Sequence, residues 1–189
     1  MRQRQTRALD YSDYLAIPED GRRHEIIAGA LHVTPAPAPV HQRISRRLLL
    51  QLVDCFHARS LGEVFGAPID LILGRHDVLQ PDLLVVDDAT QITRRGVEAA
   101  PLLVVEILSA STASRDRGVK ARRYAELGVR HYWIVDPEAR RLECHRSRAG
   151  AFEVAATAEG DARLVHPDWD GLTVDLAMLW APSEAPRPS

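Results

Sequence analysis

The chain has 189 residues, of which 46% are hydrophobic and 26% are charged, and a mass of 21.0 kDa. This apolar content suffices for one folded domain with a core, and it excludes a disordered tail or a minimal peptide scaffold. Lysine and arginine number 24 against 26 aspartates and glutamates, so the formal net charge is -2. The chain therefore lacks the overall basic field of proteins that coat DNA without specificity.

The N-terminal third predicts two helices and two strands around a proline-rich connector. The alternating prolines of this connector exclude it from a sheet. In the second helix, apolar residues recur at helical spacing and arginines occupy the other side. In chain order we expect a short helix capped by Ser12 that runs through Ile17, strands 23–27 and 30–34, the connector 34–39 and the amphipathic helix 40–58.

The remainder predicts mostly strands, with one further helix. The strand-helix-strand succession from Leu102 to Val135 is typical of a crossover between parallel strands, so we expect a mixed α/β fold. Residues 1–181 are expected to form one domain, followed by a frayed tail over 182–189. The predicted elements are a β-rich stretch over 63–73, strands 83–86 and 102–108, a helix 117–127 closed by Gly128, and strands 131–135, 141–146 and 152–156.

The chain is expected to be cytoplasmic. Its apolar runs, such as 83–86 and 102–105, are far shorter than the ~20 residues that span a bilayer. The N-terminus carries no apolar stretch of a secretory signal. Cys55 and Cys144 are too few for a disulfide framework and form no CxxC pair, which fits a reducing compartment.

Lys120 is the only lysine among 24 basic residues, so the other 23 are arginines. Because the chain uses arginine for generic positive charge, the lone lysine requires an explanation. It lies in the first or second turn of the predicted helix 117–127, where the helix dipole disfavours a cation by roughly 0.3–1 kcal/mol. We therefore expect Lys120 to face carboxylates or a phosphate; the alternative is a chance lysine on a solvated helix face.

Two carboxylates on neighbouring predicted strands are candidate metal ligands. Strand alternation places Glu106 on one face with Val104 and Leu108, where an ionised group is costly unless it is paired or bound to a cation. Asp82 stands directly before another strand. Two such carboxylates form an all-oxygen site that suits Mg²⁺ or Mn²⁺. The alternatives are an arginine partner for Glu106 and a Pro81-Asp82 pair that only marks the start of a strand.

These residues belong to a longer set of motifs that resembles a known family. The set comprises Pro81-Asp82, Glu106-Ile107-Leu108-Ser109, Lys120, Tyr124-Ala125 and the stretch from Gly128 to Pro137. It resembles the Uma-two family, which belongs to the restriction-endonuclease-like, or PD-(D/E)XK, superfamily. The resemblance extends from about Tyr14 to His145, and its specific part is the run from Val104 to Pro137.

The resemblance implies an α/β nuclease domain with a restriction-endonuclease-like core, in which helices flank a central mixed β-sheet. It implies that Asp82 and Glu106 coordinate Mg²⁺, which Mn²⁺ can replace, and that Lys120 assists hydrolysis of a phosphodiester. Glu25 matches the family's N-terminal acidic residue and completes this catalytic and metal-binding set. The alternative for Glu25 is an exposed glutamate on a strand.

The chain departs from the superfamily pattern at one position. The (D/E)XK form places a lysine two residues after its second acidic residue, and here that residue is Leu108. The resemblance supplies the lysine from the following helix instead, at Lys120. A solvent-facing Lys120 would contradict its catalytic role.

Other residues that could carry chemistry favour structural roles. The histidines are scattered without a closely spaced pair, which argues against a zinc enzyme. His41 is expected to cap a helix or lie at the surface, although it could touch a substrate. Tyr132 and Trp133 are expected in the core. Among the arginines, the best placed to contact phosphates are those on the helix of Lys120, namely Arg115, Arg117, Arg122 and Arg123.

We therefore expect a metal-dependent endonuclease that hydrolyses phosphodiester bonds in nucleic acid, with DNA the preferred substrate. A homodimer would suit cleavage of both strands, because two active sites must then face two strands. One alternative is a non-catalytic nucleic-acid or protein-interaction module that retains the fold. Another is a metal-dependent hydrolase of a different phosphoester.

Overall fold

Two six-stranded β-sheets form the framework of residues 7–182, the part of the chain that the computed structural model describes. A two-stranded sheet of β13 (Arg163–Val165) and β14 (Thr173–Asp175) accompanies them. The central sheet has the order β12 (Ala151–Glu159), β11 (Arg141–Arg148), β10 (His131–Asp136), β9 (Leu103–Ile107), β6 (Leu83–Val86) and β3 (Glu63–Gly66). The outer sheet has the order β2 (Ala30–Thr34), β1 (Arg23–Ile27), β5 (Asp77–Leu79), β4 (Leu71–Gly74), β8 (Gly96–Val97) and β7 (Ile92–Thr93).

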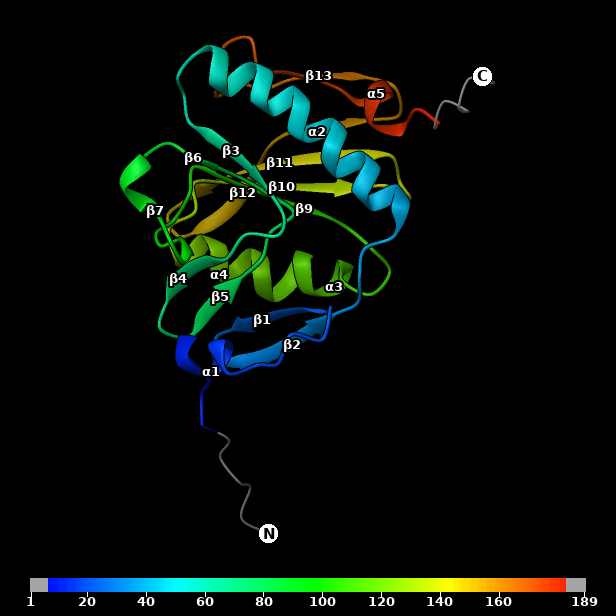
Figure 1. The fold of residues 1–189 in the computed structure, drawn as a ribbon. Helices are drawn as coiled ribbons and strands as arrows, with labels where there is room; N and C mark the ends of the chain where they lie inside the picture. Colours follow the sequence, from blue (N-terminus) through cyan, green and yellow to red (C-terminus); the bar gives the residue numbers. More distant parts are fainter. Residues whose placement is uncertain (1–6, 183–189) are drawn as a thin grey trace, which may run out of the picture.

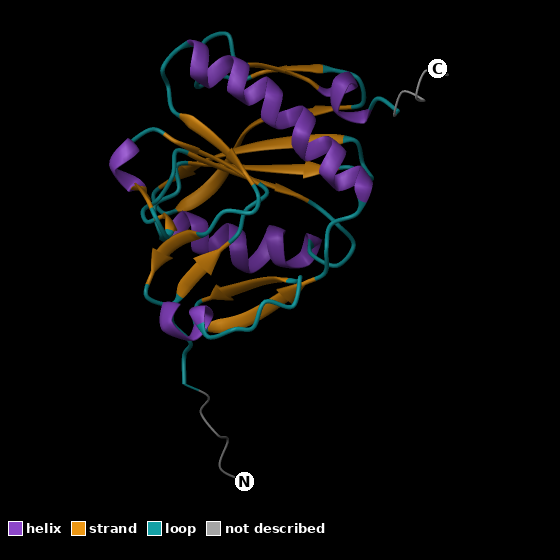
Figure 2. Cartoon of the chain, viewed as in Figure 1, coloured by secondary structure: helices purple, strands orange, loops and turns teal. Residues whose placement is uncertain are grey.

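The helices form two layers around the central sheet (Figures 1 and 2). The long helix α2 covers one face, and the segment that contains α3 and α4 lies between the other face and the outer sheet. The mixed α/β class expected from the sequence is thus confirmed. The helices are α1 (Tyr11–Leu15), α2 (Pro39–Ala58), α3 (Ala113–Arg115), α4 (Ala121–Glu126) and α5 (Leu176–Trp180), with a π-helical segment at Asp116–Lys120 and a 3-10 turn at Ala89–Gln91.

Strand β9 separates two apolar clusters by the alternation of its side chains. Leu103, Val105 and Ile107 belong to the cluster that α2 covers. Val104 and Leu108 belong to the cluster between the central sheet, the outer sheet and α4. Residue 106 shares the face of Val104 and Leu108, so the side chain of Glu106 points toward the outer sheet.

The expected crossover is present, because β9 and β10 are parallel neighbours and the helical segment 113–126 connects them. This segment begins four residues before the expected start at Arg117, and it contains the π-helical turn that periodicity did not predict. It ends as expected at Gly128, whose φ of +92° lies in the left-handed region.

Most of the other expected elements are confirmed, with small shifts of their ends. The strands 23–27 and 30–34 are observed at these bounds, and the turn residues Ala28 and Gly29 both have positive φ, as in tight two-residue hairpins. The cap of α1 was wrongly predicted: the side chain of Asp10, not of Ser12, accepts the first backbone N–H groups. In the predicted tail, residues 183–189 lie outside the described residues.

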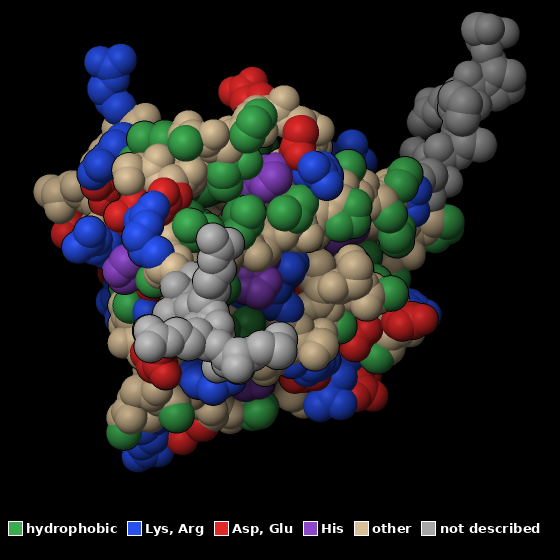
Figure 3. Space-filling model, turned by 90° about the horizontal axis from the view of Figure 1, so that it is seen from below, with side chains coloured by type: hydrophobic (Ala, Val, Ile, Leu, Met, Phe, Trp, Pro, Cys, Tyr) green, Lys and Arg blue, Asp and Glu red, His purple; other side chains and the backbone are tan. Residues whose placement is uncertain are grey.

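Within residues 7–182, none of the helices is long and apolar enough to cross a membrane. The surface seen from the side of the outer sheet mixes arginine and acidic side chains, with hydrophobic side chains between them (Figure 3). This mixture agrees with the small net charge.

The two faces of α2 allow a matched test of the packing. Leu48 is fully buried in the cluster beneath the helix, whereas Leu50 is 61% exposed. Leu48→Ala should lower the free energy of unfolding by about 2–5 kcal/mol, because it removes buried methyl groups and leaves a cavity. Leu50→Ala should change it by less than about 0.5 kcal/mol. Urea unfolding measures both, and equal losses would contradict this packing.

Candidate active site

A cleft of about 510 Å³ opens where the outer sheet meets β6 and β9. Its floor is charged and is formed by side chains from β1, β9 and the π-helical segment and by Asp82, which directly precedes β6. The proline-rich connector 35–38, the loop 109–113 after β9 and the turn 136–138 after β10 form its walls. The cleft thus combines a floor of buried charges with walls of mixed polarity.

Lys120 is the centre of the charged floor. Its Nζ lies 2.8 Å from Glu25 Oε1, 2.8 Å from Glu106 Oε1 and 3.8 Å from Asp116 Oδ1. Its side chain is 2% exposed, so the lysine does not face solvent. One ammonium group therefore links β1, β9 and the helical segment.

The helical segment directs three polar side chains at this floor. Asp116, Lys120 and Tyr124 follow one another at four-residue spacing, and all three are buried. The hydroxyl of Tyr124 donates to Glu106 Oε1 at 2.8 Å, so this oxygen accepts from both Lys120 and Tyr124. The π-helical turn spans the first two of the three residues, and such turns are frequent at functional sites.

Glu25 is held from two further sides. The backbone N–H of Gln80 donates to its Oε1 at 3.0 Å, and Arg115 Nη2 lies 3.9 Å from its Oε2. Arg115 is itself fixed by donating to Thr34 Oγ1 at 2.6 Å. Glu25 is therefore fully buried, which contradicts the alternative of an exposed strand glutamate.

Asp82 lies next to Glu106, across the strand pair β6–β9. Leu83 pairs with Val105, so Asp82 stands one position beyond that pair, next to Glu106. Three donors hold its carboxylate: Arg23 Nη1 at 3.0 Å, His41 Nε2 at 3.0 Å and the backbone N–H of Ile107 at 2.8 Å.

The structure brings all four predicted site residues together, although their roles stay predictions. It also places Arg23 and Asp116 at the site, which the sequence did not predict. His41 lies there as well, although the sequence favoured a capping or surface role and only left a substrate contact open. The expectation of a capping or surface role for His41 was wrong, because its ring also lies 3.1 Å from the carbonyl oxygen of Ile107. His41 and Arg23 had no motif signal, since their proximity to Asp82 depends on how the connector and the outer sheet pack.

The charges of the floor shift the ionisation of its members in opposite directions. Burial raises the pKa of Glu106 to about 8, and the charges of Asp116, Asp82 and Glu25 add to this effect, although Lys120 opposes it. Burial alone would lower the pKa of Lys120, but the surrounding carboxylates outweigh it and raise that pKa. Burial opposes ionisation of Asp82 too, yet His41 and Arg23 lower its pKa.

The donor set suits a hard divalent cation such as Mg²⁺ or Mn²⁺. Glu25, Asp82, Glu106 and Asp116 offer carboxylate oxygens and no softer ligand atoms. Among the residues that the structure describes, Glu25 Oε2 and Asp116 Oδ1 are buried without a hydrogen-bond partner. Lys120 contacts Oε1 of both Glu25 and Glu106. Arg23 and His41 hold the two oxygens of Asp82, so Asp82 would have to exchange one of these partners for a bound ion.

The raised pKa of Glu106 predicts a specific pH dependence of stability in EDTA. From an unfolded value near 4.5 to the folded value of about 8, the folded chain binds more protons, so stability falls as pH rises. Between about pH 7 and pH 8.5 the expected loss is on the order of 1 kcal/mol. Urea unfolding at several pH values measures it.

The control for this prediction is Glu106→Gln, which keeps an oxygen to accept from Lys120 and Tyr124 but does not titrate. Its stability should vary little over the same interval. The buried rings of His131 and His166, whose pKa burial lowers to about 4, are already neutral there. A flat profile in the native chain, or an unchanged slope in the variant, would contradict the assignment.

Comparison with known proteins yields a family match and a structural match. The family model described as "Uma2: Putative restriction endonuclease" matches residues 11–177. A solved structure described as a "putative nuclease belonging to DUF820", from Anabaena variabilis ATCC 29413, has a TM-score of 0.72, 20% sequence identity and coverage of 91% of this chain and 97% of that chain. At this identity it shows the fold alone, and no curated protein matches the chain. The family match spans most of the sequence, and the chain therefore belongs to the Uma2 family.

Proposed function

We propose that the protein is a metal-dependent endonuclease that hydrolyses phosphodiester bonds in DNA, with the charged floor of the cleft as its active site. The observation that carries the proposal is the position of Lys120. The only lysine of the chain is buried at the cleft floor, 2.8 Å from carboxylates of two different sheets. Burial of an ammonium group is costly, and apolar residues of similar volume often stabilise a fold equally well, so the buried lysine favours a role in chemistry.

Glu25, Asp82 and Glu106 are the residues that would hold Mg²⁺ or Mn²⁺, and Asp116 is close enough to Lys120 to join them. The ion would act as a Lewis acid on the phosphate and lower the pKa of a water molecule. Lys120 stays protonated because of the surrounding carboxylates. Its ammonium group would orient the attacking water and offset negative charge that develops on the phosphate oxygens.

The remaining cations of the cleft would position the substrate. Arg23 and Arg115 line the cleft with most of their side chains buried, so each can donate to a phosphate oxygen without much loss of side-chain entropy. In the reaction, the water oxygen bonds to phosphorus and the bond from phosphorus to the leaving oxygen breaks. The attacking water gives up one proton, and the leaving oxygen keeps the electron pair of the broken bond and takes up one proton, so the proton count is unchanged.

The test is cleavage of supercoiled plasmid, single-stranded DNA and RNA with Mg²⁺, Mn²⁺ or EDTA. Native protein should nick the plasmid only when metal is present. Asp82→Asn and Lys120→Met should each reduce the rate by on the order of 100-fold or more, because each removes a charge at the reacting phosphate. Asp82→Asn retains an oxygen for the backbone N–H of Ile107, so it is the variant with the smaller effect on folding.

Arg122→Met is the matched control for Lys120→Met, because Arg122 lies on the same helical segment but is exposed and does not line the cleft. Of the four arginines that the sequence favoured as phosphate contacts, only Arg115 lines the cleft. It should cleave like the native protein. Full cleavage in EDTA, or by both site variants, would contradict the proposal. No cleavage of any substrate, together with DNA binding that does not depend on metal, would favour the non-catalytic alternative.

A further inference from the structure

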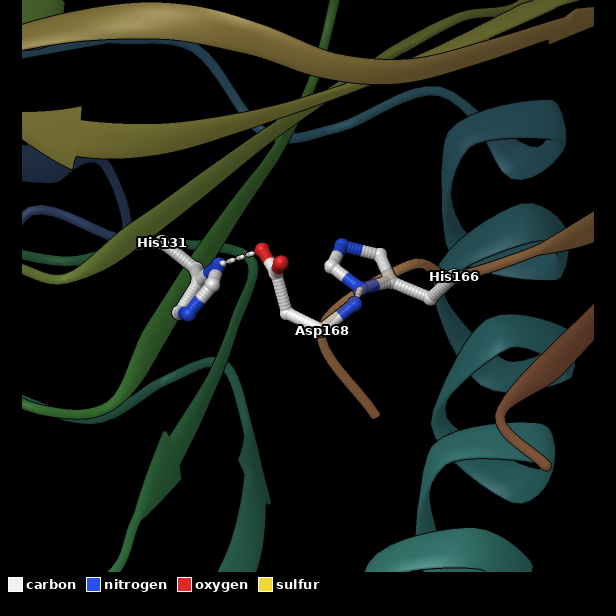
Figure 4. A group of neighbouring side chains, drawn as sticks. All are labelled: His131, His166 and Asp168. Carbon is white, nitrogen blue, oxygen red and sulfur yellow. Dashed lines mark hydrogen bonds and ion pairs between the residues drawn. The ribbon is translucent and has the colours of Figure 1, made fainter. Parts of the chain in front are cut away.

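Three potential metal ligands meet away from the cleft, at the opposite end of the strand pair β9–β10. His131 is the first residue of β10, whereas Glu106 lies near the other end of the pair. His166 and Asp168 follow β13. Each of the three side chains offers one ligand atom, and these atoms all lie within 4.8 Å of one another. Figure 4 shows Asp168 between the two imidazole rings, and we call the three residues the distal cluster.

Both rings of the distal cluster have a nitrogen that lacks a partner. Within residues 7–182, His131 Nδ1 and His166 Nε2 are buried without a hydrogen bond. His131 Nδ1 faces Asp168 Oδ2 at 3.9 Å, which is too long for a hydrogen bond. Unpartnered buried polar atoms are costly, so a common partner for the three groups would stabilise this end of the sheet.

Two other polar contacts of the cluster define how it could take up an ion. Arg146 Nη1 lies 2.6 Å from Asp168 Oδ1, which leaves Oδ2 to face His131. The backbone N–H of Asp168 donates to His166 Nδ1 at 3.1 Å. If Nδ1 of His166 binds the ion, the ion replaces this hydrogen bond. If Nε2 of His166 binds the ion, the ring proton moves to Nδ1, which can then no longer accept from Asp168. Either way, the N–H of Asp168 must turn away when an ion binds.

Aromatic rings hold the two histidines in place. The ring of Trp169 lies 4.2 Å from His131 and 4.4 Å from His166, measured between centroids. Trp133 stacks on His166 at 5.3 Å. Two of the three tryptophans of the chain therefore adjoin the distal cluster, and their fluorescence can report on its occupancy.

We infer that the distal cluster binds one Zn²⁺ ion, or a related transition-metal ion, with His131, His166 and Asp168 as ligands. Two imidazoles and one carboxylate are a donor set that suits Zn²⁺, Co²⁺ or Ni²⁺ and not Mg²⁺. Three protein ligands leave a coordination position for water. The ion would link the segment after β13 to the start of β10. Because the histidines are scattered along the sequence, their spacing did not predict this site.

The site is tested by calorimetric titration of untagged protein with Zn²⁺ in excess Mg²⁺, and by tryptophan fluorescence with Co²⁺. Native protein should bind one equivalent of Zn²⁺ in the micromolar range or tighter, and Co²⁺ should quench its emission. His131→Gln and Asp168→Asn should weaken binding by on the order of tenfold or more. The Asp168 side chain is 22% exposed, and asparagine keeps its size and an oxygen that can accept from Arg146, so this substitution should leave the fold intact.

Two controls separate the distal cluster from other ligands. His57→Gln replaces an exposed histidine at the end of α2, and Asp82→Asn alters the cleft; both should bind Zn²⁺ like the native protein. Zn²⁺ should raise the unfolding temperature of the native chain but not of Asp168→Asn. Absence of micromolar binding by the native protein, or binding that survives both ligand variants, would overturn the inference.

Discussion

The architecture depends on the burial of one ammonium group among carboxylates. Lys120 is withdrawn from water, and such a charge is tolerated only when opposite charges and hydrogen bonds surround it. Glu25 of the outer sheet and Glu106 of the central sheet supply these partners at 2.8 Å. The two sheets and the helical segment must therefore pack in one relative position, or the lysine loses a partner.

This constraint also explains why the floor contains so many ionisable groups. Four buried carboxylates share Lys120, Arg23, Arg115 and the ring of His41, so their charges nearly balance but the oxygens are not all satisfied. Burial is the main cause of the raised pKa of Glu106, and the excess of carboxylates over cations adds to it. A divalent cation would relieve the same excess, which connects the electrostatics of the fold to the proposed reaction.

Sequence reasoning identified the parts of the site that local rules determine. Strand alternation correctly placed Glu106 on a buried face, and the rarity of lysine singled out Lys120. Glu25 was identified only through the family resemblance, since nothing local distinguishes it from an exposed strand residue.

The other residues of the site depend on packing or on helix geometry that the sequence does not predict. Arg23 and His41 reach Asp82 from a different sheet and from the start of α2. Asp116 lies in a π-helical turn that no 3.6-residue periodicity describes. The meeting of His131 with His166 likewise depends on where β13 returns to the central sheet.

The burial of Lys120 among carboxylates can be measured by NMR, because protein labelled with ¹⁵N-lysine contains one lysine side-chain Nζ. We expect a slowly exchanging ammonium signal from Lys120 that stays protonated above pH 10.5, the ordinary pKa of lysine. This signal should shift in Glu106→Gln and on addition of Mg²⁺. A rapidly exchanging signal that titrates at the ordinary pKa and responds to neither change would contradict the burial of Lys120 between Glu25 and Glu106.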